Sequence, residues 1–211
     1  MFRTLAFGAA LAAAAPALAQ PAADGPTFNG LYAGAQLGWQ QDKQTLRLTD
    51  NGLESRASNK TDGFSYGGQV GYDFGLSPNF VLGVEGSVTG RTGGTNLDVD
   101  TRLSVGRTVN ATGRLGYRLD SNSLLYARGG YSNTQFRVSN DIGRVSEDRD
   151  GFTVGAGYER YLTRQVSARL EYNYSDYGRD RLPFLADSLG VDRADLGYRR
   201  HAVTAGVNFH F

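Results

Sequence analysis

Apolar and polar residues alternate with a period of two along the chain from Gly30 onward. A period of two is typical of β-strands, because successive side chains of a strand point to opposite faces. The alternation recurs in segments of about ten residues, the length that a tilted strand needs to cross a bilayer. These segments are 31–40, 64–74, 80–90, 103–118, 124–136, 151–161, 165–177 and 200–211. The pattern therefore predicts an all-β fold, an eight-stranded antiparallel up-and-down β-barrel.

The connections between these segments alternate between short and long. The short ones are 75–79, 119–123 and 162–164, and the long ones are 41–63, 91–102, 137–150 and 178–199. Short turns at one end and long loops at the other are typical of transmembrane barrels, with the turns in the periplasm and the loops outside the cell. The long connections hold many charged residues, so we expect them to be mobile loops in water.

Alternation by itself does not say which face of the sheet points outward. A soluble ligand-binding barrel with an apolar interior is the alternative to a barrel in lipid. Three features favour lipid: a Gly-rich polar face with few charges, a last strand that runs to Phe211, and aromatic residues near strand ends. These aromatic residues are Trp39, Phe64, Phe74, Phe80, Tyr117, Phe152, Phe209 and Phe211.

The first 20 residues have the pattern of a secretory signal. Arg3 is followed by an apolar run from Leu5 to Ala15, and Ala17-Leu18-Ala19 precedes Gln20. We predict a signal peptide over residues 1–19, a flexible periplasmic N-terminal leader over 20–29 and the transmembrane β-barrel over 30–211. The predicted location is the cell outer membrane.

Composition excludes several other classes of protein. The chain has 22 basic and 21 acidic residues, and removing Arg3 with the signal leaves 22 − 1 = 21 basic residues, so no excess charge indicates a nucleic-acid partner. The chain has no Cys, so neither a disulfide framework nor a lipoprotein anchor is expected. No stretch after the first 20 residues approaches 18 uncharged apolar residues, which excludes a transmembrane helix.

Several short motifs resemble one family. They are GLYAGAQLGW, GGQVGYDF, NFVLGVEG, NATGRLGYRL, LLYARGGYSN, GFTVGAGYERYL, ARLEYNYSDYG and HAVTAGVNFHF. In this order and spacing, over residues 30–211, the chain resembles the small porin-family, or OmpA-like, outer-membrane barrels of Gram-negative surface antigens. The resemblance implies a structural, antigenic or adhesive role. It also implies that the assembly machinery of the outer membrane reads a C-terminal signal made by Val203, Ala205, Val207, Phe209 and Phe211.

Six charged residues lie near the middle of strands on the polar face: Glu85, Arg114, Arg128, Glu159, Arg169 and Glu171. Arg114 and Arg128 flank the turn at 119–123 almost symmetrically, so we expect them to face each other across a strand pair. Two like charges there require carboxylates between them, and a buried charge needs a partner. These six residues predict a charge network that plugs the lumen. A gate that exchanges partners and passes small ions is the alternative.

The sequence contains few groups that an enzyme would need. Its two His are far apart, at His201 and His210, and no Ser lies two positions from His201. Glu147, Asp148 and Asp150 lack the spacing of a Ca²⁺ loop. We therefore predict no enzymatic activity, no metal and no cofactor, and a lipid A-modifying enzyme is the least favoured function.

A group of basic residues surrounds the fourth long connection: Arg179, Arg181, Arg199, Arg200 and His201. These residues predict a contact with lipopolysaccharide phosphates, and a solvated loop whose charge is balanced by nearby Asp is the alternative. The sequence as a whole predicts a monomeric barrel for envelope structure and surface display, with an ion or small-solute channel as the alternative. Its expected partners are the outer-membrane lipid, lipopolysaccharide and the assembly machinery.

Overall fold

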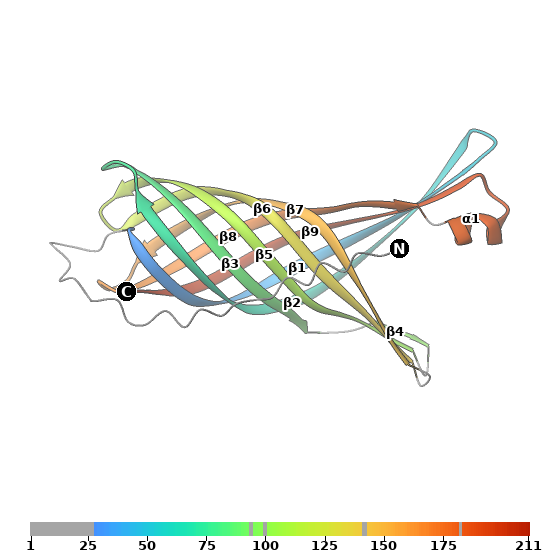
Figure 1. Cartoon of the computed structure of the whole chain (residues 1–211), viewed down its shortest axis with the longest axis horizontal. Coiled ribbons are helices and arrows are strands. Elements are labelled where there is room, and N and C mark those ends of the chain that lie inside the picture. Colours follow the sequence, from blue (N-terminus) through green and yellow to red (C-terminus); the bar gives the residue numbers. More distant parts are fainter. Residues whose placement is uncertain (1–27, 93–94, 99–100, 141–142, 182) are drawn as a thin grey trace, which may run out of the picture.

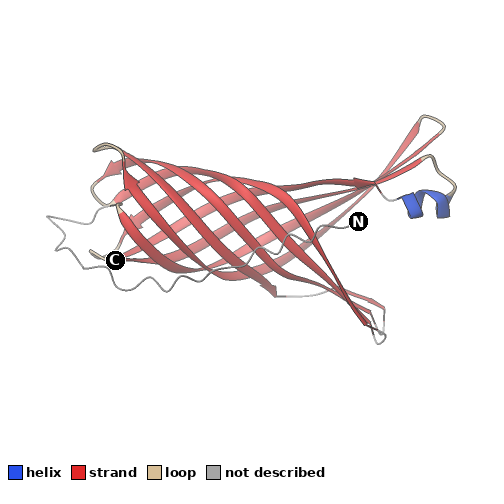
Figure 2. Ribbon diagram, in the orientation of Figure 1, coloured by secondary structure: helices blue, strands red, loops and turns tan. Residues whose placement is uncertain are grey.

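A computed structural model describes residues 28–211 except 93–94, 99–100, 141–142 and 182, and eight long antiparallel strands form its barrel (Figure 1, Figure 2). The long strands are β1 (Gly30–Asp50), β2 (Leu53–Gly75), β3 (Phe80–Thr92), β5 (Thr101–Asp120), β6 (Ser123–Asn140), β7 (Gly143–Tyr161), β8 (Val166–Arg181) and β9 (Arg193–His210). A short strand β4 (Thr95–Asp98) pairs with β5, and a short helix α1 (Pro183–Leu189) joins β8 to β9.

The sheet closes on itself. Strands that follow one another in the ring are hydrogen-bonded, β1 pairs with β9, and β3 pairs with β5. The prediction of an eight-stranded antiparallel barrel is therefore confirmed. Closure matters in hydrocarbon, because every backbone N–H and C=O needs an internal partner there. In the part of the chain that the structure describes, no helix has the length and apolar character needed to span a bilayer.

The apolar face of the sheet points outward. On β1, Leu37 is 69% exposed, whereas its neighbour Gln36 is 7% exposed and lies in the interior. The same alternation runs along β3 and β9, where every second side chain is buried. A barrel with an apolar exterior and a polar interior is the reverse of a soluble ligand-binding barrel, so the lipid-facing interpretation of the sequence is the correct one.

The prediction of four long loops is wrong, because most of those residues continue the strands. β1 and β2 run on beyond the predicted segments and meet at Asn51-Gly52, whose φ angles are +48° and +80°. Both residues in the left-handed region make a type I′ turn, for which Asn-Gly is the preferred sequence. β6 and β7 extend in the same way to Asn140 and Gly143. On β2 every side chain from Leu53 to Lys60 is exposed, so water covers both faces there and the sequence lacks the apolar alternation that marks a half-buried strand.

Beyond the barrel the extensions form two separate prongs, which Figure 1 shows at the end that carries α1 and β4. One prong contains β2, β1, β9 and β8, and the other contains β4, β5, β6 and β7. They separate because β3 pairs with β2 only as far as Phe64 and Thr92, and β8 pairs with β7 only as far as Phe152 and Asp176.

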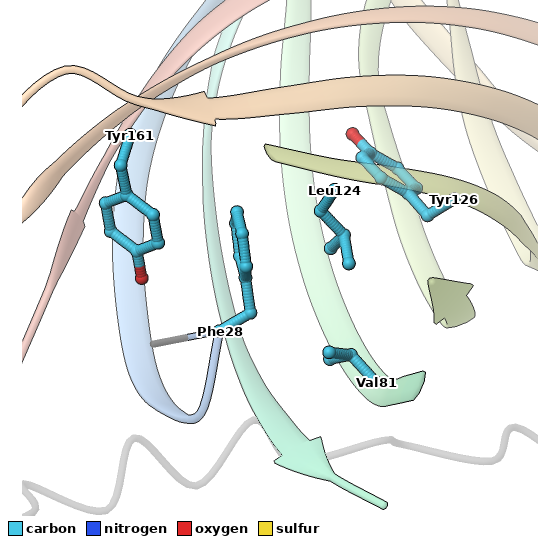
Figure 3. Close-up of a cluster of buried hydrophobic side chains, with 5 residues drawn as sticks. All are labelled: Phe28, Val81, Leu124, Tyr126 and Tyr161. Carbon is cyan, nitrogen blue, oxygen red and sulfur yellow. The ribbon is translucent and has the colours of Figure 1, made fainter. Parts of the chain in front are cut away.

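The opposite end, which has the short turns, holds an apolar cluster. Phe28 is fully buried and packs with Val81, Leu124, Tyr126 and Tyr161 (Figure 3). The backbone carbonyl of Phe28 accepts a hydrogen bond from Arg118 at 3.2 Å.

This packing corrects the predicted flexible leader over 20–29 at its last two residues. Phe28 is buried, and the side chain of Asn29 accepts a hydrogen bond from the backbone N–H of Gly75 at 3.2 Å. Residues 20–27 and the predicted signal peptide over 1–19 lie outside the described residues.

Candidate functional site

Two arginines and two glutamates form a closed ring of ion pairs in the middle of the lumen. Arg128 lies 3.1 Å from Glu85 and 2.8 Å from Glu171. Arg169 lies 2.5 Å from Glu85 and 3.5 Å from Glu171. Each cation therefore contacts both anions, and all four side chains are almost fully buried. Four of the six residues singled out in the sequence come together here.

The other two, Arg114 and Glu159, form a second group with Asp73. Arg114 donates to both carboxylate oxygens of Asp73 and to Glu159 at 2.8 Å. The register places Arg114 directly opposite Arg128, as the turn symmetry predicts, but the two cations turn to different carboxylates. Asp73 is absent from the predicted network. It is the single carboxylate on the polar face of segment 64–74, and this was the signal available in the sequence.

Two tyrosines connect the ring to the Arg114 group. Tyr32 donates to Glu85 at 2.8 Å, and Tyr126 donates to Glu171 at 2.6 Å. The guanidinium carbon of Arg114 lies 4.6 Å from the ring centre of Tyr32 and 5.1 Å from that of Tyr126. Glycines make room for these rings, because a β-carbon would lie 2.3 Å from the Tyr32 hydroxyl at Gly71 and 2.6 Å from the Tyr126 hydroxyl at Gly157. The glycines of the polar face thus let long side chains cross the lumen.

A third group of charges lies in the lumen near the prongs. Arg200 donates to Asp42 at 2.7 Å and to Thr108 at 3.0 Å, and Arg91 donates to the other oxygen of Asp42 at 2.8 Å. Tyr198, also buried, accepts a hydrogen bond from Arg200 at 2.9 Å. Sequence reasoning missed this group because Asp42 and Arg91 fall in segments that it assigned to loops.

Arg200 corrects the predicted lipopolysaccharide contact. It is only 5% exposed and points into the lumen, so it does not reach lipid phosphates outside the barrel. Arg199 and His201 belong to the opposite face of β9, the face of Val203. Continuing the alternation of this strand backward from Val203 places Arg200 inside, a signal that the sequence already contained.

The remaining predicted residues lie on the outside. Arg179 and Arg199 are exposed at the base of the prong, and the side chain of Arg181 is not among those described. His201 accepts or donates a hydrogen bond with the Tyr172 hydroxyl at 2.7 Å. The residues of the predicted C-terminal signal all face outward, namely Val203, Ala205, Val207, Phe209 and Phe211.

A small polar cavity separates the ring from the Arg200 group. Its free volume is about 60 Å³, and Ser87, Asn110, Thr153 and Ser175 are among the side chains that line it. This volume has room for several water molecules. Among the described residues, the ion pairs of the lumen join five arginines to five carboxylates, so these charges balance. The arginines are Arg91, Arg114, Arg128, Arg169 and Arg200, and the carboxylates are Asp42, Asp73, Glu85, Glu159 and Glu171.

One Ser–His pair lies in the lumen, near the apolar cluster. The Ser167 hydroxyl lies 3.0 Å from His210 Nε2 and donates its proton to Glu159 at 2.5 Å. Since the Ser167 proton goes to Glu159, His210 Nε2–H donates to the Ser167 oxygen. His210 therefore does not act as a base toward Ser167, and the pair lacks the arrangement of an activated nucleophile. Within the described residues no group of three or more His, Asp or Glu is arranged to hold a metal ion.

Comparisons with known proteins agree with the architecture. The family model for the outer membrane protein beta-barrel domain matches residues 10–211. The chain is 32% identical over 150 residues to a 22 kDa outer membrane protein of Rhizobium leguminosarum, covering 70% of this chain and 67% of that protein. It is 28% identical to a 31 kDa outer-membrane immunogenic protein of Brucella melitensis, covering 100% and 95%.

Among solved structures, Neisserial surface protein A superposes with a TM-score of 0.51 at 16% identity, covering 83% of this chain and 97% of that one. At this identity the likeness shows the fold alone.

Proposed function

Because the chain belongs to the outer membrane protein β-barrel family, and so lies in the outer membrane, we propose that it is a structural and surface-display barrel with a lumen closed by ion pairs. The observation that carries this proposal is the closed ring, in which Arg128 and Arg169 each contact both Glu85 and Glu171. Both carboxylates are shared by the two arginines, so neither arginine has an unpaired carboxylate in the ring with which it could exchange partners. This arrangement supports a plug over a partner-exchanging gate.

The prongs support surface display. They stand at the end opposite the short turns, which is the extracellular end of a transmembrane barrel. On β2 every side chain from Leu53 to Lys60 is exposed. Relatives are named as outer-membrane immunogenic proteins, which supports a non-enzymatic role at the cell surface. The proposal needs no cofactor and treats the protein as a monomer.

The proposal predicts that the refolded native barrel gives no steady current in a planar bilayer. Replacing both Arg128 and Arg200 with Ala should produce conductance steps. The ring and the Arg200 group, which lie on the two sides of the polar cavity, each lose a guanidinium group that fills the lumen. Single-channel recording in symmetrical salt measures both results.

The control is Arg160→Ala, which removes an exposed Arg at the end with the short turns and should leave the barrel silent. Steady current through the native protein would instead make an ion channel, with the polar cavity on its path, the function of the barrel.

We also propose that the outward face of β9 is the assembly signal. Phe211 is 72% exposed and its ring lies 5.2 Å from that of Phe209. Phe211→Ala should lower the amount of folded protein in the outer membrane several-fold. Quantifying the heat-modifiable band in membrane fractions measures this amount.

Phe80→Ala is the matched control for this signal, because Phe80 is a 46% exposed aromatic at the same end of the barrel, on β3. An equal loss from both variants would mean that an aromatic residue at the membrane interface is needed, and would argue against a signal specific to β9.

A further inference from the structure

The outer face of the first prong carries cations directly above the lipid-facing aromatic residues. In the last apolar row, Trp39 pairs with Phe64 and with Val203, and Val203 pairs with Tyr172. Two rows further along the same face, Lys43 pairs with both Lys60 and Arg199. Two rows beyond that, Arg47 pairs with Arg56. We call this surface the outer basic face; its cations are Lys43, Arg47, Arg56, Lys60, Arg179 and Arg199.

Like charges face each other on this surface. Lys60, Lys43 and Arg199 occupy adjacent positions on three neighbouring strands, with Asp176 on the far side of Arg199. Arg47 lies between Arg56 on one side and Asp195 on the other. Like charges directly opposite one another destabilise a sheet unless an anion lies between them. The inner face of the same strands differs, because Asp42 and Arg200 alternate with these residues and pair with each other in the lumen.

A hollow lies between these rows of cations. Its volume is about 320 Å³, and Arg47, Arg179, Arg199, Thr45 and Gly197 are among the residues that line it. Gly197 has no side chain to occupy this space, although a β-carbon there would make only an ordinary contact, 3.4 Å from the side chain of Arg179. Three arginines and two aspartates line the hollow, so its lining keeps a net positive charge, and its size can accept a phosphate group.

The acids of the hollow are already engaged. Asp176 accepts hydrogen bonds from Arg199 at 3.1 Å and from the backbone N–H of Gly178 at 2.9 Å. Asp195 lies 3.3 Å from Arg193. Within the described part of the chain, Arg47 and Arg179 have no carboxylate within 4.0 Å.

The positive field of Arg47 and Arg179 reaches the neighbouring acid. The pKa of Glu54 lies below its ordinary value, first because Arg56 donates a hydrogen bond to it and also because of the charges of Arg47 and Arg179. Glu54 itself pairs with Arg56 at 2.9 Å, so the charges of Arg47 and Arg179 remain available to an external anion.

We propose that the outer basic face binds the phosphate groups of a phosphorylated glycolipid of the outer leaflet, with Arg47, Arg179 and Arg199 as the phosphate ligands. The position specifies a lipid over a soluble anion, because the hollow lies on the same outward face as the lipid-facing aromatic residues, beginning four residues beyond Tyr172 on β8 and six beyond Trp39 on β1. Acyl chains can lie against those aromatic residues while the headgroup reaches the arginines. This set corrects the one predicted from sequence: Arg200 and His201 leave it and Arg47 joins it, while the side chain of Arg181 lies outside those described. The proposal rests on the placement of the barrel in the outer membrane and is independent of whether the lumen conducts.

The test compares binding of bisphosphorylated and dephosphorylated lipid A to the folded protein in detergent, by native mass spectrometry. The native protein should retain the bisphosphorylated form and bind the dephosphorylated form far more weakly. Arg47→Gln with Arg179→Gln should weaken binding of the bisphosphorylated form about 30-fold, from about 1 kcal/mol for each lost cation. Neither residue has an ion pair to break, so the barrel should still fold.

Gly197→Leu separates the hollow from simple charge attraction. It keeps every cation but fills the hollow, and it too should weaken binding of bisphosphorylated lipid A. The matched control is Arg160→Gln with Arg164→Gln, which removes two exposed cations at the end with the short turns and should change nothing.

Three results would overturn the proposal. One is equal binding of the two forms of lipid A, and another is equal loss in the control variant. The third is displacement of lipid A by inorganic phosphate at a comparable concentration, which would show a site for free phosphate and not for a lipid.

Discussion

Arg114→Ala is expected to lower the free energy of unfolding by about 3–5 kcal/mol, because it leaves two buried carboxylates without their cation. Arg114 is the ion-pair partner of Asp73 and lies 2.8 Å from Glu159, and both acids are fully buried. The loss also removes the cation that lies over the Tyr32 and Tyr126 rings. Urea unfolding of the barrel in lipid vesicles, followed by tryptophan fluorescence and gel mobility, measures the change.

Removing the charges of Arg114, Asp73 and Glu159 together tests whether unpaired carboxylates cause this loss of stability. Arg114→Met combined with Asp73→Asn and Glu159→Gln keeps the volume but leaves no unpaired charge, so it should recover most of the lost stability. Arg160→Ala, at an exposed position, should change stability by no more than about 0.5 kcal/mol. A loss below about 1 kcal/mol for Arg114→Ala would mean that this ion pair does not hold the interior together.

Gly130→Leu is expected to prevent folding or to cost at least about 3 kcal/mol, because it overpacks the lumen against the backbone of the next strand. A β-carbon at Gly130 would lie 2.1 Å from the carbonyl oxygen of Ala111 and 2.7 Å from the Cα of Thr112. Backbone atoms in a closed barrel move only if the ladder between β5 and β6 shifts. The yield of heat-modifiable protein after refolding, and its unfolding free energy in urea, measure the effect.

The adjacent glycine is a matched control on the other face. At Gly129 a β-carbon would meet nothing closer than 3.7 Å, and its direction is toward lipid. Gly129→Leu should therefore be neutral or mildly stabilising, since it adds apolar surface where hydrocarbon covers it. Similar losses from Gly129→Leu and Gly130→Leu would show that β6 needs flexibility at this point and that lumen packing is not the cause.

Much of the barrel follows from local rules that act within one strand. Alternation from Leu31 to Trp39 and from Val203 to Phe211 identifies the lipid-facing residues, because hydrocarbon outside and polar side chains inside give the two faces opposite composition. The short turn at 119–123 also determines that Arg114 and Arg128 face each other, since register in a hairpin is set by its turn.

The same rules fail where water covers both faces. The residues between Gln41 and Gly63 show no apolar alternation, although their backbone continues the ladder of β1 and β2. The Asn51-Gly52 dipeptide was the one local signal of this hairpin, because only a few residue types readily adopt two consecutive left-handed conformations.

The sequence by itself determined the eight long strands of the barrel, the face that residues of the predicted segments occupy and the positions of six of the lumen charges. Only the tertiary structure decided which charges pair, because closing the barrel brings together residues as distant as Asp42 and Arg200, or Glu85 and Arg169. The tertiary structure also decided that Asp73 pairs with Arg114, which keeps Arg114 out of the four-residue ring. The physical reason is that alternation specifies a direction within one strand, whereas an ion pair across the lumen depends on the tilt and shear of all eight strands.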